Sequence, residues 1–177
     1  MTTKHELDGE LAGLAALQAK LATSHLTDDE QETLAELFAA EQERRAGAWR
    51  HARAEQAIGL LFPTWRGSRI EKPKHPMWHE KSWWWNGASI DALEERANGD
   101  MGATLSSYVG CGDTDTIYGF IIKKEWLEAE DMPAVIQAYC VDQAAARERK
   151  SADQERARAQ ADLAAAQARL AELGAGT

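Results

Sequence analysis

The feature that most constrains the fold is a long stretch near the C-terminus that contains no glycine or proline. It lies between Pro133 and Gly174, and one unbroken helix over it would be about 60 Å long at 1.5 Å per residue. Proline fits the first helical turn and glycine is a natural C-terminal stop. Such a helix cannot bury an apolar stripe by itself, so we expect it to pack on other helices or on a second chain. The stripe is formed by Val135, Ala138, Val141 and Ala145 at one end and by Leu163, Ala166, Leu170 and Leu173 at the other.

Two further helices are predicted at the N-terminus. The spacing of the leucines from Leu7 to Leu21 predicts one over residues 4–22. Thr27 and Glu30 form a capping-box pattern, which predicts a second helix from there to about Ala57. We expect these helices and the C-terminal one to form an antiparallel bundle or coiled-coil stalk. Homodimerisation through the stalk is also predicted, because the helices carry more apolar stripe than one hairpin can cover.

The centre of the chain has the composition of a small α+β unit. Residues 104–109 and 116–122 are rich in β-branched and aromatic residues and predict two strands of a hairpin. Ser89 followed by residues 90–97 predicts a short helix, and a third strand is expected near 82–85. The predicted fold class is therefore α+β, predominantly α. It divides into a helical hairpin (1–57), a Trp-rich α+β head (58–132) and a C-terminal long helix (133–177).

Aromatic and cationic residues are concentrated in one segment of the predicted head. Five of the seven tryptophans lie between Trp65 and Trp85, interleaved with lysines, arginines and histidines. Aromatic faces beside cations can stack on bases, sugars or protein side chains, and they can equally build the core of a small domain. The candidate partner-binding residues are Arg66, Arg69, Lys72, Lys74, Trp78, His79 and Trp84. The plainer alternative is that most of the rings are structural and the charges belong to a solvated loop.

The charge distribution favours a protein partner over nucleic acid. The net charge is −9, and the basic segment 66–81 is short and followed by an acidic stretch over 82–132. A duplex-binding protein presents a large basic face, because neutralising phosphates supplies most of the affinity. Single-stranded nucleic acid, which needs open bases for stacking, stays as the alternative. An accessory or inhibitory role is expected for a small acidic chain of this kind.

The loop 110–115 offers a different kind of site. Cys111 could act as a nucleophile with His75 or His79 as its base, and Asp113 with Asp115 could hold a divalent cation. A glycine-flanked hairpin loop is more often only a turn. Two histidines four residues apart share one face only on a helix, and Pro76 interrupts this pair. We therefore predict no metal, cofactor or catalytic residue, and a non-enzymatic protein is favoured over a small-molecule or metal-dependent enzyme.

The remaining composition bears on location. No run of 18 apolar residues occurs, so no membrane span is predicted. The N-terminus lacks a basic segment followed by an apolar one, as a secretory signal would require. The two cysteines do not suggest a disulfide framework. These features predict a cytoplasmic protein.

Overall fold

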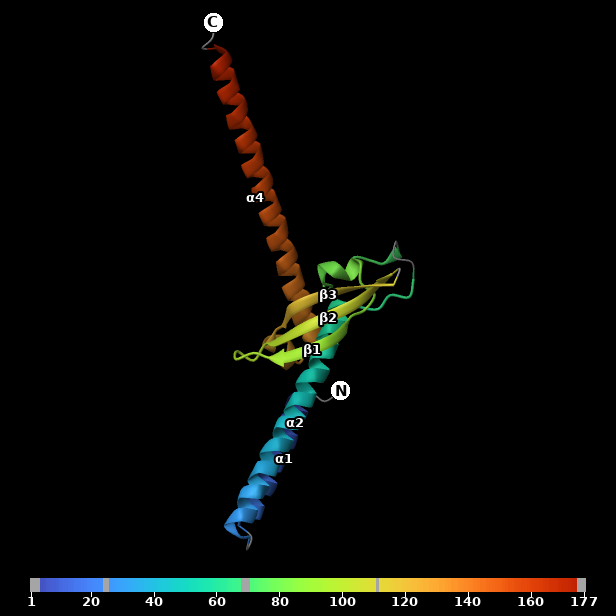
Figure 1. Ribbon diagram of the computed structural model, residues 1–177, viewed down its shortest axis with the longest axis vertical. Helices are drawn as coiled ribbons and strands as arrows, with labels where there is room; N and C mark the ends of the chain where they lie inside the picture. Colours follow the sequence, from blue (N-terminus) through green and yellow to red (C-terminus); the bar gives the residue numbers. More distant parts are fainter. Residues whose placement is uncertain (1–3, 24–25, 68–70, 111, 175–177) are drawn as a thin grey trace.

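The computed structural model describes residues 4–23, 26–67, 71–110 and 112–174, with side chains described as far as residue 169. Figure 1 shows a small head from which two helical arms leave in opposite directions. One arm is the hairpin of α1 (Lys4–Ala22) and α2 (Asp28–Leu61), and the other is α4 (Met132–Gly174). The protein is mostly helical with one small antiparallel sheet, so the predicted α+β class with a predominance of helix is confirmed.

The N-terminal helices form as predicted. The capping box is present at α2: the Thr27 backbone N–H donates to Glu30 Oε2 at 2.9 Å, and the Glu30 N–H donates to Thr27 Oγ1 at 3.4 Å. The helix continues one turn beyond Ala57, to Leu61. Its last turns are buried because they pass beneath the sheet, and burial of Ile58 and Leu61 in the core favours this extension.

The sheet of the head has the order β1-β2-β3, with β1 (Ser89–Glu95), β2 (Met101–Gly110) and β3 (Asp113–Ile122) all antiparallel. Along β2, residues alternate between buried and half-buried, as expected when one face packs on a core. The end of α2, the short helix α3 (Lys124–Glu128) and the first turns of α4 complete that core. The opposite face carries two exposed tyrosines, Tyr108 and Tyr118.

The predicted short helix over residues 90–97 is wrong, because this segment is strand β1. Its register against β2 shifts between Ile90 and Ala92, which indicates a bulge. The bulge lets Ile90 and Leu93, three residues apart, pair with the inward-facing Leu105 and Ala103. A three-residue apolar spacing is typical of a helix, so a bulged strand produced a helical pattern. Here Asn98-Gly99 does not end a helix. It forms the turn between β1 and β2, with Gly99 at φ +81°.

The third strand predicted near residues 82–85 is also absent, since the segment forms a single 3₁₀ turn, η2 (Glu80–Trp83). His79 begins this turn by accepting a hydrogen bond from the Lys81 N–H at Nδ1, 3.2 Å away. The Ser82 hydroxyl donates to the carbonyl of Leu61, which anchors the turn to the end of α2. These local and tertiary bonds stabilise a turn where a strand was predicted.

The long C-terminal helix is confirmed, and α4 is about 65 Å long at 1.5 Å per residue. Only its first turns enter the core, through Met132, Ile136 and Cys140. From Val141 to Arg169 every residue except Ala145 is exposed. Figure 1 shows α4 running away from the α1–α2 hairpin, so the three helices do not lie side by side in one chain. Packing of α4 on a second chain stays a prediction. Within the described residues, no helix is long and apolar enough to cross a bilayer.

Candidate functional site

The Trp-rich segment packs on the sheet through Trp85. This side chain is 1% exposed, and its ring centroid lies 5.1 Å from that of Phe62. Its Nε1–H donates to Asp115 Oδ2 at 2.9 Å, and the same oxygen accepts from Lys81 Nζ, also at 2.9 Å. Those two donors, led by Lys81, hold the pKa of the Asp115 carboxyl below its ordinary value. Asp115, predicted as a loop ligand, therefore ties the Trp-rich segment to β3.

Lys72 is buried and its side chain binds the backbone of the same segment. Its residue is 4% exposed, and its ammonium donates to the backbone carbonyls of Ser82 at 2.5 Å and Trp85 at 2.9 Å. A buried ammonium is tolerated when it is hydrogen-bonded in this way. The prediction of Lys72 as an exposed partner-binding residue is corrected accordingly: it holds the turn that carries Trp85.

Several cations of the Trp-rich segment contact aromatic rings of the same segment. Three lysines each lie over a tryptophan of the same segment, within the range of a cation–π interaction. The distances from Nζ to the ring centroid are 5.6 Å for Lys72 over Trp78, 6.0 Å for Lys74 over Trp83, and 5.6 Å for Lys81 over Trp85. In the sequence, these alternating lysines and tryptophans resemble a ligand-binding surface. In the structure, their contacts with one another help to stabilise the head.

Several of the predicted site residues do lie at the surface. Trp84 is 61% exposed, and Arg66 and Lys74 are exposed. Trp78 and His79 are half-buried, and Asp113 is exposed at the start of β3. Arg69 and Cys111 lie outside the described residues.

Both histidines proposed as metal ligands or as a catalytic base are used in local turns. His75 Nδ1 accepts from the Met77 N–H at 3.1 Å, and His79 Nδ1 accepts from the Lys81 N–H. The His79 ring also packs between Phe62 and Phe120, at centroid distances of 4.9 and 5.6 Å. Within the described residues, no three potential ligands come together as a metal site would require.

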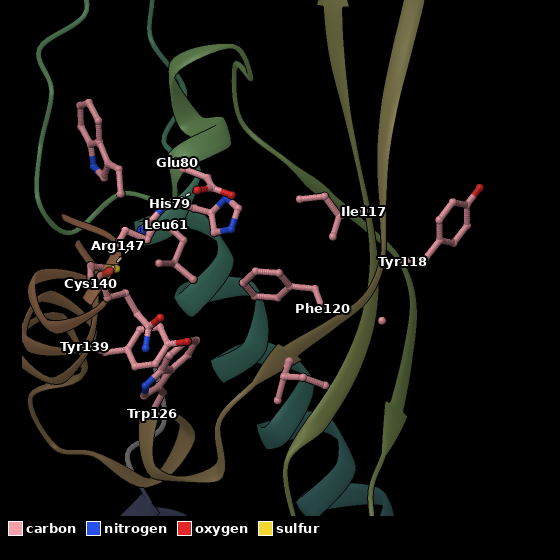
Figure 2. A pocket seen from close by; sticks show the side chains of 14 residues that line it. Leu61, His79, Glu80, Ile117, Tyr118, Phe120, Trp126, Tyr139, Cys140 and Arg147 are labelled. Atoms are coloured by element: carbon pink, nitrogen blue, oxygen red, sulfur yellow. Dashed lines mark hydrogen bonds and ion pairs between the residues drawn. The ribbon is translucent and has the colours of Figure 1, made fainter. Parts of the chain in front are cut away.

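A groove of about 440 Å³ lies between β3, the η2 segment and the first turns of α4. Figure 2 shows Phe120 and Ile117 pointing toward the helices, with Trp126 and Tyr139 across from them. The Glu80–Arg147 ion pair joins η2 to α4 at one end. Polar and apolar surface make up the walls in nearly equal parts. The aromatic and apolar side chains among the lining residues include Leu61, Trp78, Ile117, Phe120, Trp126 and Tyr139, and the charged pair Glu80 and Arg147 also lines the groove.

Sequence reasoning missed most of this groove, since only Trp78 and His79 among its residues were predicted as site residues. One signal was present: Tyr139, Gln143 and Arg147 recur at a spacing of four, which places them on one face of α4. This face of α4 is not the one that carries the apolar stripe from which the helix was predicted.

The geometry of the groove is the basis for its interpretation. Comparisons with protein-family models, with curated proteins and with solved structures found no match for this chain. Function is therefore inferred from the contacts, burial and charges around the groove.

Burial favours the neutral forms of two groups in the groove, His79 and Cys140. Burial is the main cause of the lowered pKa of His79. The charge of Glu80 opposes this lowering, and the charges of Arg147 and Lys81 add to it. Burial also raises the pKa of the Cys140 thiol, which donates to the Met77 carbonyl at 3.3 Å. A thiol without a lowered pKa is a poor nucleophile, so this pair is better suited to a binding surface than to chemistry.

The state of His79 leads to a prediction about stability. Its pKa in the folded chain lies below the ordinary value of 6.5, so the unfolded chain binds the proton more readily. The free energy of unfolding should therefore fall as pH decreases from about 7 to about 5. In His79→Asn, whose side-chain oxygen can still accept from the Lys81 N–H, this fall should be smaller. Urea denaturation across the pH range measures it, with His75→Asn at the exposed histidine as the control. An equal pH dependence in His79→Asn and the unchanged protein would contradict the assignment.

Proposed function

We propose that this protein is a non-enzymatic binding module, whose head engages a protein partner through the groove between β3, η2 and α4. The observation that carries the proposal is the groove itself: an open hollow lined by several aromatic side chains and assembled from segments that are distant in the sequence. An accessory or inhibitory role follows from this proposal, because a small chain that occupies a surface of a larger protein can block it. The predicted cytoplasmic location is part of the same proposal.

The chemistry of the groove supports a protein partner. Interface cores are apolar and rich in aromatic side chains, as are the walls formed by Phe120, Trp126 and Tyr139. Single-stranded nucleic acid is supported less well, because Lys72 and Lys81 are already engaged with backbone carbonyls and with Asp115. Trp84 and Lys74 are exposed on the Trp-rich segment and are further candidates for contact with the partner.

The partner proposal can be tested by photo-crosslinking in the cells of origin. A benzoylphenylalanine at Gln143, an exposed residue of the groove, should capture one specific protein, and the same group at Arg158, far along α4, should not. The purified partner should then bind the unchanged chain and Asp142→Trp, but bind Gln143→Trp at least about tenfold more weakly. Asp142 is the exposed neighbour of Gln143 and does not line the groove. Equal binding by both variants, or capture of nucleic acid alone, would contradict the proposal.

We further propose that α4 pairs with a second copy of the chain. Alanines recur at every seventh position, at Ala138, Ala145, Ala152, Ala159 and Ala166, which allows two helices to approach closely along one seam. Acidic side chains flank this seam on one side, at Glu148 and Glu155, and arginines flank it on the other, at Arg149 and Arg156. In a parallel pair each side meets the opposite side of the partner helix, so acid faces base. Val141 and Leu163 are exposed apolar side chains on this stretch of α4. Pairing with a second helix would remove them from water.

Self-association leads to a prediction about mass. The protein should have twice the 19.5 kDa mass of one chain in light scattering at micromolar concentration. The double variant Ala152→Glu, Ala159→Glu should be monomeric, because it places four like charges at the seam of a pair. Ala157→Glu, Ala164→Glu adds the same charges on the opposite side of the helix and should leave the dimer intact. A monomeric mass for the unchanged chain would rule out the pairing.

A further inference from the structure

We propose that the groove binds an extended segment of the partner, which pairs with the free edge of β3 and adds a fourth strand to the sheet. This inference rests on the proposed function and specifies the chemistry of the partner. Strand addition of this kind obtains its affinity from main-chain hydrogen bonds and its specificity from pockets for alternate side chains.

The backbone of β3 forms one wall of the groove. β3 is at the end of the sheet order, so one of its edges has no neighbouring strand in the described residues. Five consecutive residues, 117–121, line the groove. Among them Gly119 has no side chain, and Figure 2 shows Tyr118 pointing away from the hollow. These two residues can therefore line it only through their main chain. Apart from its pairing with β2, no backbone hydrogen bond from another described segment reaches this stretch.

The part of β3 that lines the groove lacks one protection that edge strands usually have, namely charged side chains. Charged side chains discourage pairing with another strand, and β1, the opposite edge, carries Asp91, Glu94 and Glu95. The stretch from Thr116 to Ile122 has no charged residue. Both edge strands have a bulge. β3 also has two acids, Asp113 and Asp115, but they lie at its start, outside the stretch that lines the groove. An uncharged, unpaired edge beside a groove is suited to receive a strand.

The rest of the groove is suited to the side chains of such a segment. Alternate side chains of an added strand point to the same face as Ile117 and Phe120, toward the apolar wall formed by Leu61 and Tyr139. That wall also includes Trp126, which is 1% exposed and whose Nε1–H has no hydrogen-bond partner in the described residues. A buried unpaired donor is uncommon, and a main-chain carbonyl is one acceptor that could pair with it. The occupant we infer is therefore an uncharged, extended peptide with alternating apolar residues.

The probe for this inference is a peptide selected from a displayed library of random sequences of about ten residues. Selection uses the full chain as the target, and Gln143→Trp removes peptides that bind elsewhere. We expect selected peptides with alternating apolar residues. Fluorescence anisotropy should show binding by the unchanged chain and by Asp142→Trp. Hydrogen exchange should slow at residues 117–121 when the peptide binds, and a failure to select any such peptide would overturn the inference.

The decisive measurement uses backbone N-methylation of the selected peptide. Methyl groups at every second residue remove the hydrogen bonds on one edge of a strand only. One of the two alternating sets should weaken binding at least about tenfold, and the other should leave it nearly unchanged.

Equal effects of the two methylated sets on binding would overturn strand addition. Self-association of the protein that Gln143→Trp abolishes would also overturn it, because the groove would then be occupied by a second copy of the chain. If the captured partner binds through Gln143 but is insensitive to peptides that pair with β3, strand addition fails and the proposed function stands. If the peptides pair but no protein is captured, the proposed function fails.

Discussion

Trp85→Ala is expected to lower the free energy of unfolding by about 3–5 kcal/mol, the cost typical of removing a buried aromatic ring. Trp85 contacts Phe62 and donates to Asp115, so its removal leaves a cavity and takes away one of the two donors to Asp115 Oδ2. Trp84→Ala, at the next position, should change the same quantity by less than about 0.5 kcal/mol, because Trp84 is mostly exposed.

Urea denaturation followed by circular dichroism measures both variants. The two substitutions delete the same side chain from adjacent residues, so composition and unfolded-state effects nearly cancel in their difference. A comparable loss of stability in both variants would show that the assignment of Trp85 to the core and Trp84 to the surface is mistaken.

A second large effect is expected at Lys72. Lys72→Met keeps the aliphatic stem but removes the ammonium that donates to the carbonyls of Ser82 and Trp85. Leaving a buried acceptor without a donor costs about 1–3 kcal/mol, so we expect a loss of at least about 2 kcal/mol from the two together. Lys74→Met is the matched control, since Lys74 is exposed two residues away.

Thermal and urea denaturation of the two lysine variants test this assignment. If Lys72→Met were as stable as the unchanged chain, the ammonium would not hold the turn that carries Trp85. The difference between the two lysines also separates a structural cation from one left available to a partner.

The elements that sequence reasoning predicted well are specified locally. The capping box at Thr27 and the stretch without glycine or proline after Pro133 each depend on neighbours along the chain. Strand β1 was misassigned because its bulge is set by pairing with β2, and its apolar spacing alone is equally compatible with a helix. The strands β2 and β3 were predicted but began earlier than expected, at Met101 and Asp113.

The candidate site was harder to predict because its determinants are contacts between distant residues. The Lys81–Asp115 bond joins residues 34 positions apart, and the Glu80–Arg147 ion pair joins residues 67 positions apart. From composition alone, Lys72 and Lys74 are equivalent cations in one loop. Which of them turns inward is decided by carbonyls at Ser82 and Trp85 that the pattern of residue types does not show.

The start of α4 has one consequence for how the protein could bind. Tyr139, Gln143 and Arg147 line the groove, and they lie on the side of the helix opposite the alanine seam that begins at Ala138. Pairing along the seam would leave both grooves open and facing away from each other, near one end of the dimer. A partner that displays two matching segments could then engage both grooves, and the second contact would form at the high effective concentration set by the first. Such bivalency can raise apparent affinity by about 10²–10⁴ without any new contact in either groove.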